Sequence, residues 1–238
     1  MIVVVGLAFE ARIAAASGVQ VICGGDGRNL RPSLHEAIAP GCKGLISFGV
    51  AGGLAPDLEP GTCIVGSGVV SADGRLATDR VWSQALLRAM PDAVPGVLAG
   101  APAPVATPAE KGALHRETGA LAVDTESHVV AGAAAHHGLP MAAIRVVCDP
   151  ATRSLPELAL RAIRPDGSTD IAALLGALLR RPDQVAGLLQ IALDARCARA
   201  TLLQCCRLLG PDLGLAGAGQ PETGVLEGVE PGFDPAVG

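Results

Sequence analysis

Short runs of consecutive apolar residues recur along the N-terminal part of the chain, separated by stretches with helical periodicity. Residues 2–5 are apolar throughout and end at Gly6, a pattern typical of a strand buried on both faces of a sheet. Residues 19–23 and 141–148 have the same character, and the second of these runs ends at Asp149. Strands that alternate with helices in this way predict an α/β layered fold.

The remaining elements follow from the same pattern and from glycine and proline positions. Pro102, Pro104 and Pro108 indicate a loop or an edge strand. Gly138 and Pro140 end the helix predicted at 127–137. In chain order the sequence predicts a helix at 7–16, a helix at 34–38, a strand at 63–70, and helices at 82–90 and 109–117, followed by a strand at 120–123 and a helix at 127–137.

The stretch 44–54 combines a short apolar strand with a cluster of glycines. Leu45, Ile46 and Phe48 are expected to form the strand, and residues 49–53 to turn sharply after it. Glycine permits positive φ and lets backbone N–H groups approach a ligand without a Cβ in the way. A turn of this kind lies at the carboxyl edge of an α/β sheet, where ligands bind, although it also occurs in proteins that bind none.

The amino-acid composition of the chain changes after Pro165. Residues 171–179 and 185–209 are leucine-rich and predict two helices, and glycine, proline and acidic residues dominate from residue 210 onward. We therefore expect a single domain over residues 1–209, in which residues 168–209 form a helical C-terminal extension, and a disordered tail over 210–238.

Composition limits the function classes. The chain has 238 residues, of which 50% are hydrophobic and 2% aromatic, with a net charge of −5. Few aromatic rings and a negative charge argue against a nucleic-acid partner. The seven cysteines lack the spacing of zinc sites or ordinary disulfides, so we expect thiols in a reducing cytoplasm. The start of the chain reads as a strand and not as a signal peptide, and no apolar run is long enough to span a membrane.

Neither a metal nor an organic cofactor is expected. The five histidines show no ligand spacing, and the glycines around residue 25 do not match a dinucleotide-binding fingerprint with its downstream acid.

Three acidic residues fall beside the expected strand edges. Glu10 lies in the first turns of a helix, Glu126 at the start of another, and Asp149 at the end of a strand before a proline. Each has a plain structural alternative: a solvated helix residue for Glu10, a first-turn acid stabilised by the helix dipole for Glu126, and a strand-end carboxylate for Asp149.

Four short motifs, taken in order, resemble the purine nucleoside phosphorylase/nucleosidase superfamily, which includes methylthioadenosine/S-adenosylhomocysteine nucleosidase. They are Val-Val-Gly-Leu-Ala-Phe-Glu at 4–10, Ser-Phe-Gly-Val-Ala-Gly-Gly-Leu-Ala-Pro at 47–56, Ala-Val-Asp-Thr-Glu-Ser at 122–127 and Arg-Val-Val-Cys-Asp at 145–149. The resemblance covers roughly residues 1 to 165 and implies three αβα layers around a mixed, twisted sheet. The region after Glu126 and the C-terminal segment resemble the hopanoid-associated phosphorylases.

The resemblance implies a role for each matching position. Asp149 would protonate the leaving purine, with Arg145 nearby to position it, and Glu10 would orient or deprotonate the attacking water. Glycosidic cleavage develops positive charge on the sugar, which carboxylates stabilise. The substrate would contact Glu126 through the ribose hydroxyls, and the sugar and base would be lined by Thr125, Val50, Ala51, Gly52, Pro104 and Val105.

The nucleophile is left open, with water favoured over phosphate. The two side chains with which family phosphorylases grip phosphate are replaced by Ser47 and Val50. Gly25 and Arg28, in another glycine-rich turn, form a candidate anion-binding loop that would suit phosphate, or a plain turn with a solvated arginine.

The implied substrate is a small-molecule nucleoside, with adenosylhopane as the leading expectation and purine nucleoside or methylthioadenosine salvage as the alternative. A nucleoside-binding protein without activity is the non-enzyme alternative. Two leucine stripes would wall a channel for a lipid-linked substrate, make a peripheral membrane contact, or only cap the core; they comprise Leu174, Leu175, Leu178, Leu179, Leu188, Leu189, Ala192 and Leu193. A homo-oligomer, most simply a dimer, is expected, with the alanine-rich helix 127–137 as a packing surface.

Overall fold

The computed structural model describes residues 1–15, 19–24, 29–156, 158, 162, 164, 166–170 and 185–216. The strands are β1 (Ile2–Val5), β2 (Gln20–Cys23), β3 (Leu45–Gly53), β4 (Cys63–Ser71), β5 (Gly74–Ala77), β6 (Val94–Gly100), β7 (Ala122–Asp124) and β8 (Met141–Asp149). The helices are α1 (Ala8–Ala15), α2 (Leu30–Ala37), α3 (Arg80–Ala89), α4 (Pro108–Thr118), α5 (Ser127–His137) and α8 (Val185–Leu209).

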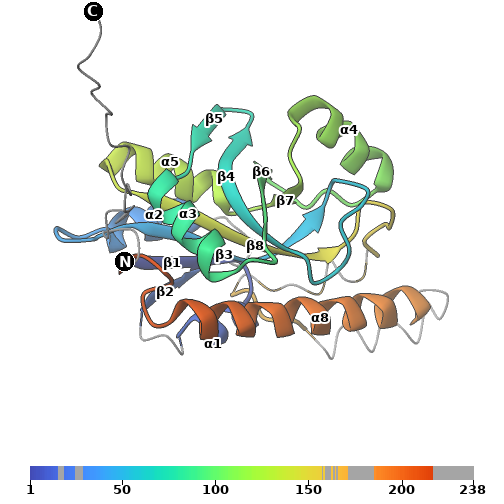
Figure 1. Ribbon diagram of the computed structural model, residues 1–238. Helices are drawn as coiled ribbons and strands as arrows, with labels where there is room; N and C mark the ends of the chain where they lie inside the picture. The colour runs from blue at the N-terminus through green and yellow to red at the C-terminus, as the bar shows by residue number, and fades with distance from the viewer. Residues whose placement is uncertain are drawn as a thin grey trace, which may run out of the picture.

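One mixed sheet connects all these strands, and part of it closes on itself. β3 is parallel to β1 and β8, while β8 is antiparallel to β4. β4 and β6 are parallel, β6 and β7 are parallel, and β7 returns to β3 in antiparallel pairing. Strands β3, β8, β4, β6 and β7 therefore form a closed ring, with β1 paired to β3 and β2 to the far side of β1 (Figure 1).

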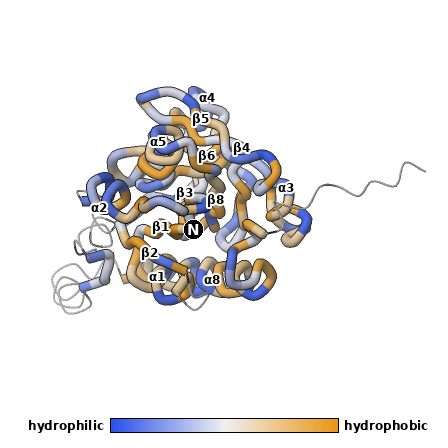
Figure 2. Tube along the Cα trace, turned by 90° about the vertical axis from the view of Figure 1, so that its left-hand side faces the viewer, coloured by the Kyte–Doolittle hydropathy of each residue, from blue (hydrophilic) through white to orange (hydrophobic). Residues whose placement is uncertain are grey.

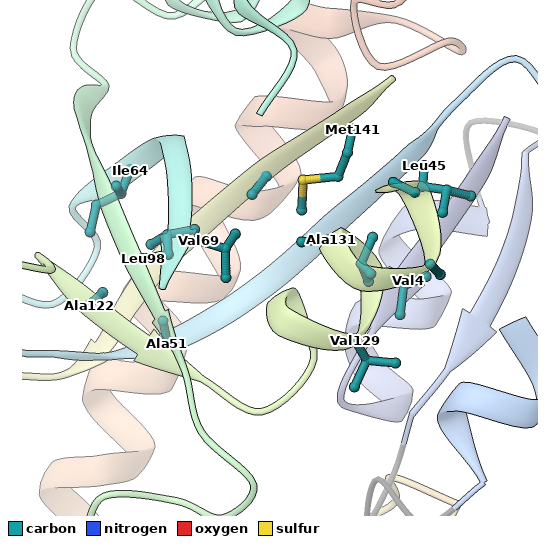
Figure 3. Close-up of a cluster of buried hydrophobic side chains, with 14 of the residues drawn as sticks. Val4, Leu45, Ala51, Ile64, Val69, Leu98, Ala122, Val129, Ala131 and Met141 are labelled. Carbon is teal, nitrogen blue, oxygen red and sulfur yellow. The ribbon is translucent and has the colours of Figure 1, made fainter. Parts of the chain in front are cut away.

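Helices cover both faces of this sheet, which confirms the expected α/β fold with a mixed central sheet. α2 and α5 pack on one face, where the side chains of α5 meet those of β1 and β3 (Figure 3). α1, α3 and α8 cover the other face, and α8 runs along the sheet beside α1 (Figures 1 and 2). No helix among the described residues is both long and apolar enough to cross a bilayer.

The structure corrects the expected turn in the glycine cluster. β3 continues as one strand through Gly53, with an irregularity in its pairing to β8 between Ala51 and Gly52. The glycines are therefore strand residues, and their lack of a side chain serves close packing within the sheet.

Two strands were missed in the sequence. β5 is a short exposed partner of β4. β6 contains Pro95 and Gly96, residue types that are depleted in strands. The glycine is required by packing, because a Cβ at Gly96 would lie 2.2 Å from Cδ1 of Leu121.

In the C-terminal part, the expected helix at 185–209 corresponds to α8 (Val185–Leu209). Residues 210–216 continue as an ordered turn, in which Leu213 is fully buried and its carbonyl accepts a hydrogen bond from Nε1 of Trp82 at 3.0 Å. Leu202 and Leu209 of α8 are buried against the same cluster, so this helix is part of the domain core. The predicted helix 171–179 and the tail beyond residue 216 lie outside the described residues.

Candidate active site

Glu10 ties the end of β1 to the middle of β3. Its Oε2 accepts hydrogen bonds from the backbone N–H groups of Gly6 and Leu7 at 2.9 and 2.8 Å, and its Oε1 accepts one from Val50 at 2.6 Å. The residue stands in the first turn of α1, immediately after β1, and is 1% exposed. It is thus a buried, three-fold hydrogen-bonded carboxylate and not a solvated helix residue.

Gly49 makes room for this carboxylate. A Cβ at Gly49 would lie 2.5 Å from Oε1 of Glu10, and the residue has φ of 152°, which side-chain-bearing residues rarely adopt. The glycine therefore allows Glu10 to lie directly against the β3 backbone.

Arg145 is the cation at the centre of the site. It is fully buried on β8, and its Nη2 lies 2.5 Å from Oγ of Ser47, 3.1 Å from Oε2 of Glu126 and 3.2 Å from Oδ1 of Asp124. Its Nη1 donates to the carbonyl of Val50 at 3.2 Å. Val50 thus contacts Glu10 through its N–H and Arg145 through its carbonyl.

The expectation that Arg145 positions Asp149 is wrong. The two residues pair with different parts of β3, Arg145 with Gly49 and Asp149 with Gly52. The guanidinium binds Glu126 and Asp124, and the Asp149 carboxylate is held by Lys111. The arginine therefore binds the carboxylates of Glu126 and Asp124, and Asp149 is paired with a different cation, Lys111.

Asp124 fixes the start of α5 and with it Glu126. Its Oδ1 accepts hydrogen bonds from the N–H groups of Glu126 and Ser127 at 2.9 and 2.6 Å, and its Oδ2 accepts one from Oγ of Ser127 at 2.7 Å. Ser127 also lies 3.0 Å from Oγ of Ser47. Thr125 donates a hydrogen bond to Oε1 of Glu126. This network fixes the backbone at Glu126, whose Oε2 lies 3.1 Å from Nη2 of Arg145.

Burial raises the pKa of Glu10 and of Glu126. The pKa of Glu10 rises from 4.5 to about 7, chiefly because the group is desolvated; Arg145 and the backbone N–H groups oppose the rise, and Glu126 adds to it. Desolvation likewise raises the pKa of Glu126. One arginine thus faces the three carboxyl groups of Glu10, Asp124 and Glu126, so acidic groups outnumber the cation in this part of the site.

Asp149 lies at the end of β8, against a strand position without a side chain. A Cβ at Gly52 would come within 3.2 Å of Oδ2 of Asp149. Desolvation raises the pKa of Asp149, and the neighbouring Lys111 opposes the rise. Asp149 also borders a cavity of about 120 Å³ between the end of β8 and α8, lined further by Pro150, Arg153, Ser154, Gly187, Gln190, Ile191 and Asp194.

The other predicted site residues differ in their burial, and two of them lie outside the described residues. Ala51 is buried in the core, and Thr125 is half-buried beside Glu126. Val105 packs against the small apolar cluster around Leu54, whereas Pro104 is exposed. The candidate anion-binding residues Gly25 and Arg28 lie outside the described residues.

The motif alone did not assign Asp124, Ser127 and Lys111. The sequence could have indicated Asp124, because an Asp just before a helix commonly accepts hydrogen bonds from the N–H groups two and three residues later. Lys111 has no local signal. It lies in α4, whose start is marked by the capping box of Thr107 and Glu110, and its neighbours are mostly exposed.

The family model of the phosphorylase superfamily matches residues 7–180. The chain belongs to the phosphorylase superfamily. This confirms the resemblance of the four motifs at the level of the superfamily. A search of curated proteins finds no match.

Solved structures of nucleosidases share the superfamily fold with this chain. A Helicobacter pylori methylthioadenosine/S-adenosylhomocysteine nucleosidase mutant with 5′-methylthioadenosine in the active site is 16% identical, with a TM-score of 0.59 over 76% of this chain and 97% of that one. The Colwellia psychrerythraea nucleosidase in complex with adenine is 16% identical, with a TM-score of 0.58 over 74% and 93%. Native Helicobacter pylori futalosine hydrolase is 19% identical, with a TM-score of 0.55 over 62% and 87%.

Proposed function

We propose that this member of the superfamily is a nucleosidase that cleaves the N-glycosidic bond of an adenosyl compound with water. Asp149 protonates the leaving purine, Glu10 orients and deprotonates the water, and Glu126 binds the ribose hydroxyls. The superfamily match and the nucleosidases of the same fold support cleavage of a nucleoside.

The observation that carries this proposal is the set of three buried carboxylates around one arginine. Positive charge that develops on the sugar in the transition state is stabilised by carboxylates in a site of low dielectric. The same excess of acidic groups opposes a phosphate dianion, and the one buried guanidinium among the described residues already binds Glu126 and Asp124. Water is neutral and meets no such repulsion, so hydrolysis is favoured over phosphorolysis.

The test is an assay of adenine release from adenosine, methylthioadenosine, S-adenosylhomocysteine and adenosylhopane, each with and without phosphate. We expect release that is independent of phosphate and yields the free sugar. A sugar 1-phosphate formed only with phosphate would reassign the enzyme as a phosphorylase. If no substrate released its base while adenine still bound, the nucleoside-binding alternative would stand.

For the substrate, adenosylhopane remains our proposal, with methylthioadenosine or S-adenosylhomocysteine salvage as the alternative that the solved nucleosidases favour. Support for a lipid-linked substrate comes from α8, where Val185, Leu189 and Leu193 follow one another at helical spacing and are 47%, 61% and 46% exposed. Leu188 is half-buried and Ala192 exposed. The other stripe, Leu174 to Leu179, lies outside the described residues.

Leu189→Gln tests the lipid proposal, with Leu208→Gln as the matched control. Both leucines are more than half exposed on the same helix, 61% and 51%, but Leu208 lies at the opposite end. We expect Leu189→Gln to lower adenine release from adenosylhopane several-fold, on the order of the free energy of one apolar contact, and to leave release from adenosine unchanged. Equal activity of both variants on both substrates would contradict a lipid-binding role for this stripe.

A homo-oligomer, most simply a dimer, remains part of the proposal, although three alanines of the helix first expected at its interface are buried. Ala131, Ala133 and Ala134 of α5 are at most 4% exposed and pack on the sheet of their own subunit. These three alanines of α5 are thus used inside the domain, whereas Ala135 is exposed and Gly132 half-buried. Light scattering at micromolar concentration measures the oligomeric state directly.

A further inference from the structure

Lys111 is a buried cation outside the predicted set of site residues. The sequence has two lysines, Lys43, which is exposed, and Lys111, which is fully buried. A lysine is almost never fully buried unless its charge is paired. Lys111 meets this condition through the end of β8: its Nζ lies 2.5 Å from Oδ2 of Asp149.

The three hydrogens of the ammonium group have three acceptors. Besides Asp149, Nζ donates to the carbonyl of Pro150 at 2.9 Å and to the carbonyl of Arg153 at 3.1 Å. An ammonium group has three donors and no acceptor. Lys111 is therefore saturated by the residues that follow β8, and it has no donor left for a ligand, so it can influence a reaction only through Asp149.

The contact also settles which oxygen of Asp149 is used. Oδ2 is occupied by Lys111, so a proton destined for a leaving base is carried on Oδ1. A side chain held by one oxygen on a saturated partner loses little rotational freedom when the substrate binds, and such positioning lowers the barrier of a proton transfer.

We infer that Lys111 is the positioning residue of the general acid: it holds Oδ2 of Asp149 and stabilises the carboxylate formed when Oδ1 gives its proton to the purine. This inference rests on the proposed function. In the step itself, the O–H bond of Asp149 breaks and an N–H bond forms on the purine ring. The electron pair of the glycosidic C–N bond leaves with the base, and water adds to the sugar carbon while its proton passes to Glu10.

The charge of Lys111 then stabilises the Asp149 carboxylate that remains after the proton has been transferred. A buried carboxylate without a partner is costly, whereas one at 2.5 Å from an ammonium group is an ion pair. Burial raises the pKa of Asp149 and Lys111 lowers it. Burial thus keeps the proton in place before the reaction, and Lys111 makes its release less unfavourable.

The experiment compares Lys111→Met with Lys43→Met, which removes the exposed lysine. Methionine keeps much of the volume and removes the charge. We expect Lys111→Met to lower kcat by about tenfold or more, within the range of general acid catalysis. Because a cation near Asp149 favours its ionised form, its loss raises the pKa of Asp149, and the basic limb of kcat/KM moves to higher pH. Lys43→Met changes neither quantity.

A double-mutant cycle separates positioning from a merely structural role. If Lys111 acts through Asp149, Lys111→Met has no further effect on the residual activity of Asp149→Asn. Losses that multiply, or a lowered kcat with the basic limb in its original place, would overturn the inference. Thermal melts of all variants show which of them fold.

A second measurement uses the wild-type protein and therefore does not depend on whether a variant folds. In protein labelled with ¹³C-lysine, the Lys111 signal should shift with pH as Asp149 titrates and should shift when adenine binds, while the Lys43 signal responds to neither. A Lys111 signal that ignores both changes would also overturn the inference. This result is distinct from failure of the proposed function, in which the wild type releases no base although Lys111 still senses Asp149.

Discussion

Asp149→Asn is expected to reduce base release by at least about a hundredfold and to leave the fold intact. Asn has nearly the same shape, and its carbonyl oxygen can still accept a hydrogen bond from Lys111. It cannot give up a proton, so the purine would have to leave as an anion. The loss should therefore appear in kcat, with an unchanged thermal melt.

A substrate with a better leaving group gives the sharpest form of this test. A riboside of p-nitrophenol needs no proton to depart, so Asp149→Asn should cleave it at close to the rate of the wild type. The ratio of the cleavage rates of adenosine and of this riboside, compared between the wild type and Asp149→Asn, then measures the contribution of the proton transfer. Asp149→Asn with wild-type activity toward adenosine would remove Asp149 from the mechanism.

Glu10→Gln is expected to lower hydrolysis by about a hundredfold, because an amide cannot accept the proton of the attacking water. The pKa of Glu10 is about 7, and a base must be ionised to act. The acid limb of kcat/KM in the wild type should therefore lie near pH 7 and be absent from the residual activity of Glu10→Gln. An unchanged acid limb would assign the base to another residue.

The same pKa predicts the pH dependence of stability. The pKa of Glu10 is higher in the folded protein than its ordinary 4.5, so the folded state binds the proton more tightly. The stabilisation is complete below about pH 4.5 and is lost as the pH rises through 7, on the order of 3 kcal/mol. The difference in the free energy of unfolding by urea between pH 5 and pH 8 should be larger in the wild type than in Glu10→Gln by this contribution.

The placement of Glu10 can be tested apart from its chemistry. Gly49→Ala puts a Cβ 2.5 Å from Oε1 of Glu10 at φ of 152°, whereas Gly74→Ala puts one in open space at φ of 115°. Both variants carry backbone strain, but only the first displaces the carboxylate. Hydrolysis should fall in Gly49→Ala and be retained in Gly74→Ala.

The sequence could predict those parts of the site that are carried by local pattern. Apolar runs ending at Gly6 and Asp149 located two strand ends, and the motif order located Glu10 and Glu126. What their side chains contact could not be predicted, because each contact joins distant segments. Lys111 is 38 residues from Asp149 along the chain, and nothing in a mostly polar helix separates it from solvated neighbours.

Glycines were the least predictable feature of the fold. In sequence, the glycines at 49 and 52 indicated a turn, because glycine is usually read as freedom of the backbone. In the structure both lie within β3, and each faces a carboxylate, Glu10 or Asp149. For the same reason β6 was not predicted: its Gly96 leaves the space that the side chain of Leu121 occupies. Only the three-dimensional neighbour distinguishes a glycine needed for space from one needed for a turn.

The hydrogen bond from Val50 to Glu10 gives the protein a built-in reporter. Most amides of β3 are bonded to the neighbouring strands β1 and β8, so their exchange with solvent deuterium requires the sheet to open. The amide of Val50 is protected by a side chain, at 2.6 Å from Oε1 of Glu10. Within β3, the exchange rate of this amide therefore follows the Glu10 carboxylate as it protonates or turns toward a substrate, while its neighbours in the strand continue to report the stability of the sheet.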